Sequence, residues 1–554
     1  MYLLRVSFAA LLLPSVFDAA QPVRAKHAMV VTREEHATAI GLRILKSGGN
    51  AIDAAVAVGF ALAVTHPSAG NIGGGGFLLA RFADGRAIFI DFRECAPGKA
   101  TRDMYLDREG KPNGGSITGW KASGVPGSVR GFELAHKKYG RKPWAELVYP
   151  AVQLAAKGFP VSYGLATSLK NHKSFAKFPE SRRIFQRNGK FYEPGELLVQ
   201  PELARTLSRI AKLGARDFYE GDTAHILARQ MAANGGLITL EDLRNYEALE
   251  RRPLEGDYKG HHILGAPPPS SGGVGILQML GMLEGSGYER SGAGSAAVIH
   301  FVAEVMRRFY ADRSAYLADP DYFRTPVQML LDRNYILQRR SSIDLTKATP
   351  SADVRPGNLA DRESPETTHY SIVDAEGNAV AVTYTLNGSY GSGVTVPELG
   401  FLLNNEMDDF SVKPGAPNMF GLIQGEANAI QPGKRPLSSM TPTIVLKEGK
   451  LYMVAGTPGG SRIISNVLQV LLNVIDFKMN IQDAVNRPRF HHQWMPDKLF
   501  LEPGFSPDTE ALLRAMGHPL ERVNSMCEVA AILVDGGWLQ GAADPRVEGK
   551  ALGY

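Results

Sequence analysis

The strongest constraint on the fold is a pair of segments, residues 367–374 and 378–387, separated by Ala-Glu-Gly. Both are rich in residues that favour β-strands, and a three-residue loop with a left-handed glycine joins antiparallel strands. If Asp374 pairs with Asn378, Thr367 lies opposite Thr385 with both side chains on one face. A slip of one residue would separate the two hydroxyls, so the predicted register decides whether they meet.

Thr367 directly follows a polar, proline-containing stretch that has no apolar periodicity. A threonine hydroxyl is a poor nucleophile unless a base lies beside it. Cleavage between Glu366 and Thr367 would supply a base, because a new α-amino group has an ordinary pKa of about 7.7 to 8.0. We interpret Thr367 as a nucleophile that carries its own base and is oriented by the Thr385 hydroxyl. Taken alone, residues 367–370 are more typical of an ordinary strand than of an active site.

A second hairpin is predicted between residues 77 and 92, after four glycines at 73–76. Its two apolar segments flank Asp84-Gly85, which is a strong turn signal, and it delivers Arg93 to the end of a strand. The glycine run is unlike a phosphate-binding loop, because it lacks the Gly-Lys-Ser/Thr ending and leaves a helix rather than entering one. We expect it to serve close backbone packing.

Helical and strand-like segments alternate in blocks, which is typical of a layered α/β protein. Residues 53–65 are almost wholly apolar and end before Pro67, which predicts a helix buried on all sides. Helical spacing of apolar residues predicts further helices at 37–45, 144–156, 202–213, 225–234 and 296–316. From residue 367 onward we expect mainly strands, until an apolar helix at 465–474.

The composition is that of a soluble globular chain, with 44% hydrophobic and 21% charged residues among 554. No low-complexity linker, repeat or break in composition divides it. The net charge of +5 is spread thinly, without a cluster of lysine and arginine. This distribution argues against nucleic acid as a partner.

Residues 1–20 resemble a secretory signal, with Arg5 ahead of an apolar run at 6–17. The run is too short to cross a bilayer, so we expect no stable membrane span. Pro14 interrupts it and the cleavage site is poorly formed, so a packed N-terminal segment is the alternative. We expect a periplasmic or secreted protein.

Neither the cysteines nor the paired histidines predict a metal site. Cys95 and Cys527 are too few for a disulfide framework and lack metal-ligand spacing, although an exported protein permits a bridge between them. His491 and His492 are neighbours on an expected strand, so their side chains point to opposite faces. We therefore expect no metal.

Several motifs occur in the order and spacing of the γ-glutamyltranspeptidases, which are N-terminal-nucleophile hydrolases that act on glutathione. They are Thr-Thr-His-Tyr-Ser-Ile-Val-Asp at 367–374, Leu-Asn-Asn-Glu-Met-Asp-Asp-Phe at 403–410, Arg-Pro-Leu-Ser-Ser-Met-Thr-Pro-Thr at 435–443 and Thr-Pro-Gly-Gly-Ser-Arg at 457–462. Further motifs at 71–77, 91–97, 267–273 and 489–494 resemble the bacterial members. The similarity covers nearly everything after about residue 23.

The resemblance implies an αββα sandwich, the fold of the N-terminal-nucleophile hydrolases. It also implies a precursor that cleaves itself between Glu366 and Thr367, and the predicted signal peptide at residues 1–20 precedes its large subunit. The products would be a large subunit of residues 21–366 and a small subunit of residues 367–554, which begins with the catalytic threonine. The two subunits would form a heterodimer.

Further site residues follow from the resemblance. Gly459 and Gly460 match the oxyanion hole, in which two backbone N–H groups meet the tetrahedral oxygen. A γ-glutamyl donor carries an α-carboxylate and an α-ammonium, so its pocket needs fixed charges of both signs. The positions matched to the carboxylate site are Arg93, Ser438 and Ser439, and those matched to the ammonium site are Asp409, Asn387 and Glu406. Without the family match, Arg93 would be read as part of a structural salt bridge and the two serines as a turn. Residues 406–409 would be read as a solvated acidic loop.

The implied activity is a two-step transfer of a γ-glutamyl group that needs no cofactor. Thr367 would attack the γ-carbonyl of glutathione or a related compound, and the resulting ester would pass to water or to an amino acid or dipeptide. Three alternatives stay open. They are an acylase for glutaryl or cephalosporin side chains, an enzyme that processes poly-γ-glutamate, and a non-catalytic exported protein that binds amino acids or peptides.

Residues 414–431 resemble the lid of the bacterial enzymes. In several of these a tyrosine closes the lid by a hydrogen bond to the asparagine matched by Asn387, whereas this chain has Phe420 at that position. We therefore expect the lid to close by apolar packing alone, with Phe420 as the anchor of a static loop as the alternative.

Overall fold

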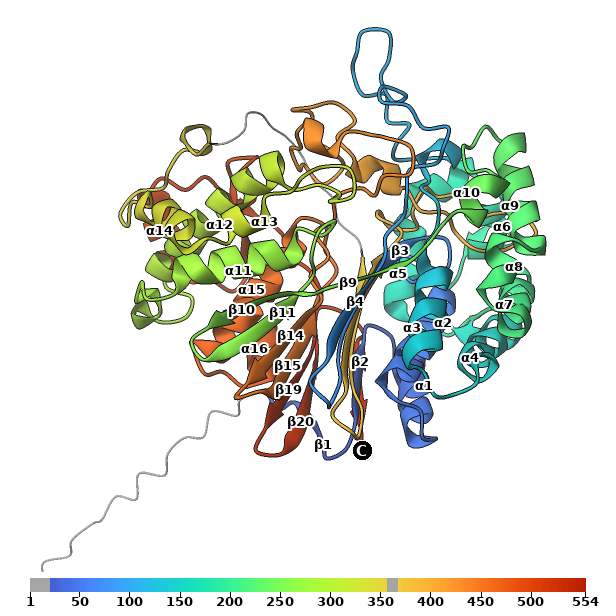
Figure 1. The fold of residues 1–554 in the computed structure, drawn as a ribbon, viewed down its shortest axis with the longest axis horizontal. Helices are drawn as coiled ribbons and strands as arrows, with labels where there is room; N and C mark the ends of the chain where they lie inside the picture. Colours follow the sequence, from blue (N-terminus) through green and yellow to red (C-terminus); the bar gives the residue numbers. More distant parts are fainter. Residues whose placement is uncertain (1–19, 356–366) are drawn as a thin grey trace, which may run out of the picture.

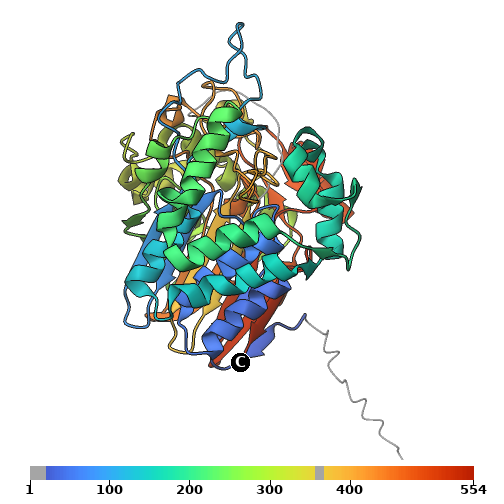
Figure 2. The same ribbon diagram turned by 90° about the vertical axis from the view of Figure 1, so that its right-hand side faces the viewer.

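Two seven-stranded antiparallel sheets lie face to face at the centre of the molecule, and helices cover the outer face of each (Figure 1). The computed structural model describes residues 20–355 and 367–554. The view in Figure 2 faces one of the two helical layers. The arrangement is an αββα sandwich, as expected.

The first sheet has the order β1-β20-β19-β15-β14-β11-β10. Its strands are β1 (Val23–Ala25), β20 (Trp538–Ala543), β19 (Ala530–Asp535), β15 (Lys450–Gly456), β14 (Thr443–Lys447), β11 (His261–Gly265) and β10 (Leu254–Tyr258). The second sheet has the order β21-β2-β12-β13-β3-β4-β9. Its strands are β21 (Lys550–Gly553), β2 (Met29–Thr32), β12 (Thr368–Val373), β13 (Ala379–Thr385), β3 (Gly75–Arg81), β4 (Ala87–Phe92) and β9 (Leu249–Arg251). Each sheet thus combines strands from before and after Thr367.

The helices that cover the second sheet come from the first half of the chain. They are α1 (Glu35–Lys46), α2 (Ala51–Thr65) and α3 (Ser128–Tyr139), which contact its strands, with α4 (Trp144–Lys157), α5 (Tyr163–Asn171), α6 (Pro179–Phe185), α7 (Pro201–Leu213), α8 (Ala215–Tyr219), α9 (Asp222–Ala233) and α10 (Leu240–Arg244) around them. On the first sheet lie α11 (Gly272–Leu283), α15 (Arg462–Ile475) and α16 (Ile481–Asn486), with α12 (Ala296–Tyr316), α13 (Val327–Leu330), α14 (Arg333–Ser341) and α17 (Pro507–Ala515) around them.

Short strands complete the structure. A three-stranded sheet contains β16 (Phe490–His491), β17 (Leu499–Leu501) and β18 (Leu520–Arg522). Two small ladders join β5 (Phe159–Pro160) to β8 (Leu197–Leu198) and β6 (Gln186–Arg187) to β7 (Lys190–Phe191).

The central hairpin has the predicted register. Thr368 pairs with Tyr384 and Val373 pairs with Ala379. The Asp374 N–H donates to the Asn378 carbonyl over 3.0 Å, and Gly377 takes the left-handed φ of 86° that the loop requires. The second predicted hairpin is also present as β3 and β4.

The segment between β13 and β14 differs from the prediction. Residues 386–442 contain no strand of either central sheet. They form turns, isolated bridges and short 3₁₀ helices at Glu406–Asp409 and Glu426–Asn428. In this segment, side chains form hydrogen bonds with backbone groups that are not paired in a β-ladder. For example, Asn404 Nδ2 donates to the carbonyls of Gly73 and Gly124, each over 2.8 Å. The expectation of mainly strands up to residue 465 is therefore wrong for this segment.

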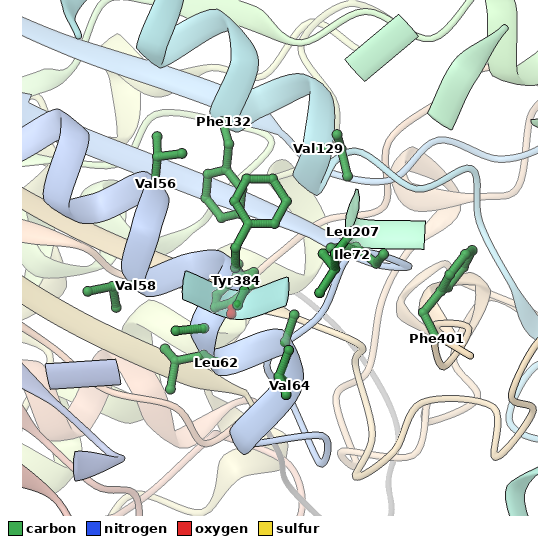
Figure 3. Close-up of a cluster of buried hydrophobic side chains, with 14 of the residues drawn as sticks. Val56, Val58, Leu62, Val64, Ile72, Val129, Phe132, Leu207, Tyr384 and Phe401 are labelled. Atoms are coloured by element: carbon green, nitrogen blue, oxygen red, sulfur yellow. The ribbon is translucent and has the colours of Figure 1, made fainter. Parts of the chain in front are cut away.

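Helix α2 is buried along its whole length, as its apolar sequence predicts. It begins with a capping box in which Asn50 and Asp53 each accept from the other's backbone N–H. Gly59 lets α3 approach closely, because a Cβ at this position would lie 2.4 Å from the Phe132 ring. The helix therefore forms the centre of the core between the second sheet and its helices (Figure 3).

Side chains of the second sheet alternate between two cores. On β3, Leu78 and Ala80 join the core beneath the helices, whereas Phe77 and Leu79 join the core between the sheets. Both faces of these strands are buried, so the register of the sheet is strongly specified.

Three further sequence predictions concern the N-terminal segment, membrane spans and the cysteines. Residues 1–19, and with them most of the predicted signal, lie outside the described residues. Within the described part of the chain, no helix is both long and apolar enough to cross a membrane. Cys95 and Cys527 are free thiols, so the bridge that export would permit is not formed.

Replacing Phe132 with alanine tests the packing of α3 on α2 and the sheet. The buried ring contacts Phe60, Phe92 and Tyr384 at centroid distances of 5.5 to 5.8 Å. We expect Phe132→Ala to lower the free energy of unfolding by about 3 to 5 kcal/mol, measured by denaturant titration. Tyr149→Ala on α4, where the side chain is 56% exposed, is the control and should change little. Equal effects would contradict the assigned core.

Candidate active site at the head of the central hairpin

The predicted site residues come together in one place. Five of them, Asn387, Glu406, Asp409, Ser438 and Ser439, belong to the loops of residues 386–442, which lie at one end of the two sheets (Figure 1). The site residues line a cavity together with four apolar side chains. The lining residues are Arg93, Thr367, Thr385, Asn387, Glu406, Asp409, Ser438, Ser439 and Gly460, with Phe420, Leu422, Met440 and Ile463. Gly459 is adjacent to Gly460, and Glu366 lies outside the described residues.

The cavity is small in this state. Its volume of about 20 Å³ is enough for roughly one water molecule. A larger group therefore enters only if part of the wall moves, and the segment that carries Phe420 and Leu422 is one part of the wall that belongs to neither central sheet.

Two threonine hydroxyls face each other at the head of the hairpin. Thr367 immediately precedes β12 and Thr385 ends β13. The Thr385 hydroxyl donates to Thr367 Oγ1 over 3.4 Å and accepts from the Asn387 N–H over 2.8 Å. This contact confirms the facing pair predicted from the register. It places the two oxygens side by side at the cavity wall.

The nearest histidine along the chain takes no part in the cavity. His369 is 1% exposed, and its two ring nitrogens lie 2.8 Å from Thr383 Oγ1 and 3.1 Å from Ser371 Oγ. Burial lowers the pKa of His369 to about 3, so the ring is neutral. A base for Thr367 must therefore come from elsewhere.

Arg93 is a fully buried cation that follows β4 directly. Its Nε donates to the Pro436 carbonyl over 3.2 Å, and its guanidinium forms ion pairs with Glu406 and Asp409. Glu94 Oε2 lies 3.7 Å from Arg93 Nη1. Burial opposes the charged form, but these carboxylates outweigh it and raise the pKa of Arg93 above its ordinary value.

Three carboxyl groups surround this single guanidinium. Burial raises the pKa of Glu94 to about 7 and raises that of Glu406 well above its ordinary value, although Arg93 opposes both shifts. Both Glu94 oxygens and Glu406 Oε2 are buried without a hydrogen-bond partner among the described residues. Burial thus favours the neutral forms of Glu94 and Glu406, and a cationic ligand beside them would favour their charged forms.

Ser438 and Ser439 lie beside the arginine on the segment that enters β14. The Ser438 N–H donates to the Pro269 carbonyl over 2.8 Å. Ser439 Oγ accepts from Arg313 Nη2 over 3.1 Å, and Arg313 Nε donates to Ser271 Oγ over 2.9 Å. Burial lowers the pKa of Arg313 to about 10.

Sequence reasoning missed Arg313. It lies 1% exposed on α12, which is otherwise a buried helix. The available signal is a set of charged residues within a largely apolar helical pattern, namely Glu304, Arg307, Arg308, Asp312 and Arg313. Buried charges require partners, so such a set predicts polar contacts inside the fold.

Gly459 and Gly460 form a tight turn between β15 and α15. Their φ angles of 132° and 55° are left-handed and favour glycine. A Cβ on Gly459 would lie 2.2 Å from Cys527 Sγ, and one on Gly460 would lie 2.6 Å from the Phe420 ring. The turn precedes the N-terminus of α15, where backbone N–H groups and the helix dipole favour negative charge.

The lid-like segment is held by polar contacts as well as by packing. Phe420 packs on Gly460, and the Asn387 amide contacts the Met419 sulfur at 3.8 Å. Asn418 Nδ2 donates to Asp409 Oδ1 over 3.1 Å, and the Met419 N–H donates to Asp408 Oδ2 over 2.7 Å. The expectation that the segment closes by apolar packing alone is therefore wrong.

Within the part of the chain that the structure describes, one group with metal-ligand chemistry lies outside the predicted site. Ligand atoms of His300, Glu304 and His518 lie within 4.8 Å of one another. However, His300 Nδ1 lies 2.7 Å from His518 Nε2, and the Glu304 carboxylate accepts from Arg307 and Arg308. These contacts already use the atoms that a metal would need.

The adjacent histidines make separate hydrogen bonds. His491 lies 2.7 Å from Ser465 Oγ through Nδ1 and 2.9 Å from Gln493 Oε1 through Nε2. His492 Nε2 lies 3.3 Å from Asp497 Oδ1. They do not share a ligand site.

Comparison with known proteins agrees with this geometry. A sequence profile of the family described as Gamma-glutamyltranspeptidase matches residues 37–554. A "Glutathione hydrolase proenzyme" of Escherichia coli K12 is 51% identical, with 100% of this chain and 99% of the relative covered. One from Pseudomonas sp. A14 is 50% identical, with coverage of 96% and 95%. An "Acylase ACY 1 proenzyme" of Pseudomonas sp. SE83 is 39% identical, with coverage of 96% and 94%.

Solved structures share the fold. Cephalosporin acylase from Bacillus halodurans superposes with a TM-score of 0.85 at 27% identity, covering 100% of this chain and 99% of the other. Helicobacter pylori γ-glutamyltranspeptidase gives a TM-score of 0.58 at 44% identity, covering 58% of this chain and 94% of that chain. Profile, full-length relatives and fold agree, and the chain belongs to the γ-glutamyltranspeptidase family of N-terminal-nucleophile hydrolases.

Proposed function

We propose that this chain is a γ-glutamyltransferase and glutathione hydrolase that becomes active after cleavage between Glu366 and Thr367. The observation that carries the proposal is the threonine pair, whose oxygens lie 3.4 Å apart in the cavity that also contains Arg93 and Asp409. The names of the full-length relatives, glutathione hydrolase proenzymes, support the same activity.

Maturation is an attack by Thr367 on its own chain. Thr367 Oγ1 adds to the Glu366 carbonyl carbon, the peptide C–N bond breaks, and the Thr367 nitrogen takes a proton as the new amine. Water then hydrolyses the ester that remains on Thr367 and releases the Glu366 carboxylate. The products are a large subunit of residues 21–366, once residues 1–20 have been removed, and a small subunit of residues 367–554.

The two subunits stay together because the cut leaves both sheets intact. Strand β12 pairs with β2, and β13 pairs with β3. In the other sheet, β14 pairs with β11. Each pairing joins a small-subunit strand to a large-subunit strand, so separation would break backbone ladders with both faces buried. A tightly associated heterodimer follows.

Acyl transfer uses the same hydroxyl. Thr367 Oγ1 attacks the γ-carbonyl of the donor, the α-amino group of Thr367 accepts the hydroxyl proton, and the C–N bond to the leaving amine breaks as that amine takes the proton. The N–H groups of Gly459 and Gly460 stabilise the tetrahedral oxyanion. Water or the amine of an amino acid or dipeptide then attacks the ester, and Thr367 is regenerated without a cofactor.

Donor recognition is divided between the two signs of charge. Arg93, with Ser438 and Ser439, binds the α-carboxylate through a planar fork of donors. Asp409 and Glu406, with Asn387, bind the α-ammonium. Support for this assignment is the burial of all these groups at one cavity wall next to Thr367.

An acylase for glutaryl or cephalosporin side chains is the second candidate, because relatives and structures with acylase names match the chain. A glutaryl donor lacks the ammonium. The acidic cluster of Glu94, Glu406 and Asp409 around one arginine favours a donor that carries it. Poly-γ-glutamate processing and simple amino-acid or peptide binding have no comparable support.

We also propose export to the periplasm or the medium, from the sequence of residues 1–20.

Thr367→Ala tests self-cleavage. The purified wild type should consist of two pieces, the smaller beginning Thr-Thr-His-Tyr, as seen by denaturing electrophoresis and N-terminal sequencing. The variant should stay a single chain without γ-glutamyl turnover, because the attacking hydroxyl is gone. Thr368→Ala is the matched control: its buried hydroxyl lacks a described partner, and this variant should still cleave. Cleavage of Thr367→Ala before residue 367 would disprove self-processing.

Asp409→Asn tests ammonium recognition. Removing one partner of a buried charge pair costs about 3 to 5 kcal/mol, so kcat/KM for a γ-glutamyl anilide should fall roughly a hundredfold to several thousandfold. The loss should be smaller for a glutaryl anilide, which has no ammonium. Asp408→Asn is the control: Asp408 binds the lid and Ser116, so both donors should lose equally. Equal losses in Asp409→Asn would make its role structural.

A further inference from the structure

The Asn418 side chain connects Asp409 of the acidic cluster to the turn of the lid-like segment, which itself packs on Gly460. It lies in the lid-like segment and is buried, with 9% of its surface exposed. Its Nδ2 donates to Asp409 Oδ1 over 3.1 Å. Its Oδ1 accepts from the N–H groups of Phe420 over 3.0 Å and Leu422 over 3.1 Å. One amide side chain therefore contacts the acidic cluster and organises the turn that closes the cavity.

The same turn reaches the expected oxyanion hole. Phe420 and Leu422 both line the cavity, and the Phe420 ring packs against Gly460. The position of the Asp409 carboxylate is thus tied, through Asn418 and the turn, to the packing over Gly460.

The Asp409 carboxylate is engaged on both oxygens. Oδ2 pairs with Arg93 Nη2 and Oδ1 accepts from Asn418. A donor α-carboxylate that binds Arg93 must compete with this internal ion pair. Asp409 then loses a cationic partner while it remains buried, which is costly unless another cation replaces it. The donor's ammonium supplies that cation, whereas a glutaryl donor does not.

We propose that Asn418 is a positioning residue that determines specificity for donors with an α-ammonium. It holds Asp409 in place while the donor's ammonium replaces Arg93, and it transmits that position to the lid turn over Gly460. This inference rests on the proposed roles of Arg93 and Asp409. It adds a lid residue, outside the sequence motifs, to the recognition of the donor.

The test compares two donors in three variants of the mature, cleaved enzyme. Asn418→Ala removes the donor to Asp409 and the acceptor for the turn. Asn418→Ser keeps a short side chain that can accept locally from the Phe420 N–H but cannot reach Asp409. Asn428→Ala is the matched control, because Asn428 Nδ2 donates to the Asp409 main-chain carbonyl over 2.7 Å and leaves the carboxylate untouched.

We expect kcat/KM for a γ-glutamyl anilide, divided by that for a glutaryl anilide, to fall about tenfold or more in both Asn418 variants. In Asn428→Ala both donors should lose by the same factor, so the ratio should not change. A purely structural role for Asn418 in the lid would lower both donors equally and overturn the inference. A fall of the ratio in Asn428→Ala as large as in the Asn418 variants would overturn it as well.

The outcomes separate this inference from the proposed function. If the cleaved wild type fails to turn over the γ-glutamyl anilide, the proposed function is wrong. If the wild type is active and Asn418→Ser keeps the wild-type ratio, only the role of Asn418 is wrong. Cleavage before Thr367 in every variant, checked by electrophoresis, shows that the fold around the hairpin has formed.

Discussion

The backbone pairing of β12 with β13 is the constraint on which the site depends. These strands lie in the middle of a seven-stranded sheet, with β2 and β3 on either side. Both faces of the sheet are buried, so a slip of one residue would move every apolar side chain into the wrong core. The packing of the whole molecule thus fixes the register that brings Thr367 opposite Thr385.

A second constraint is the cost of burying Arg93. A guanidinium without contact to water requires acceptors on all its nitrogens, and the loop of residues 403–410 supplies two carboxylates. These ion pairs tie the end of β4 to a segment more than 300 residues away in the chain. This arrangement is costly to bury and leaves carboxyl oxygens without hydrogen-bond partners among the described residues, which fits the proposed binding of a zwitterion better than a role in stability alone.

Buried polar side chains also replace regular structure above the sheets. Asn404, Asn418 and Asn428 each bond to backbone or carboxylate groups of neighbouring loops. Such contacts let residues 386–442 form a defined wall without strands.

Local sequence patterns were sufficient to predict much of the structure of this protein. The two hairpins, the buried helix α2 and the facing threonines follow from turn residues and from the periods of strands and helices, which act over a few residues. The positions of Arg93, Asp409, Ser438 and the glycine turn came from the family resemblance, because nothing local brings distant loops together. The contacts of Arg313, Asn418 and Cys527 could not be predicted at all. Each of these buried side chains makes contacts with residues that are remote in sequence. Which of them meet is therefore decided only by the stacking of the two sheets and by the loops that cross above them.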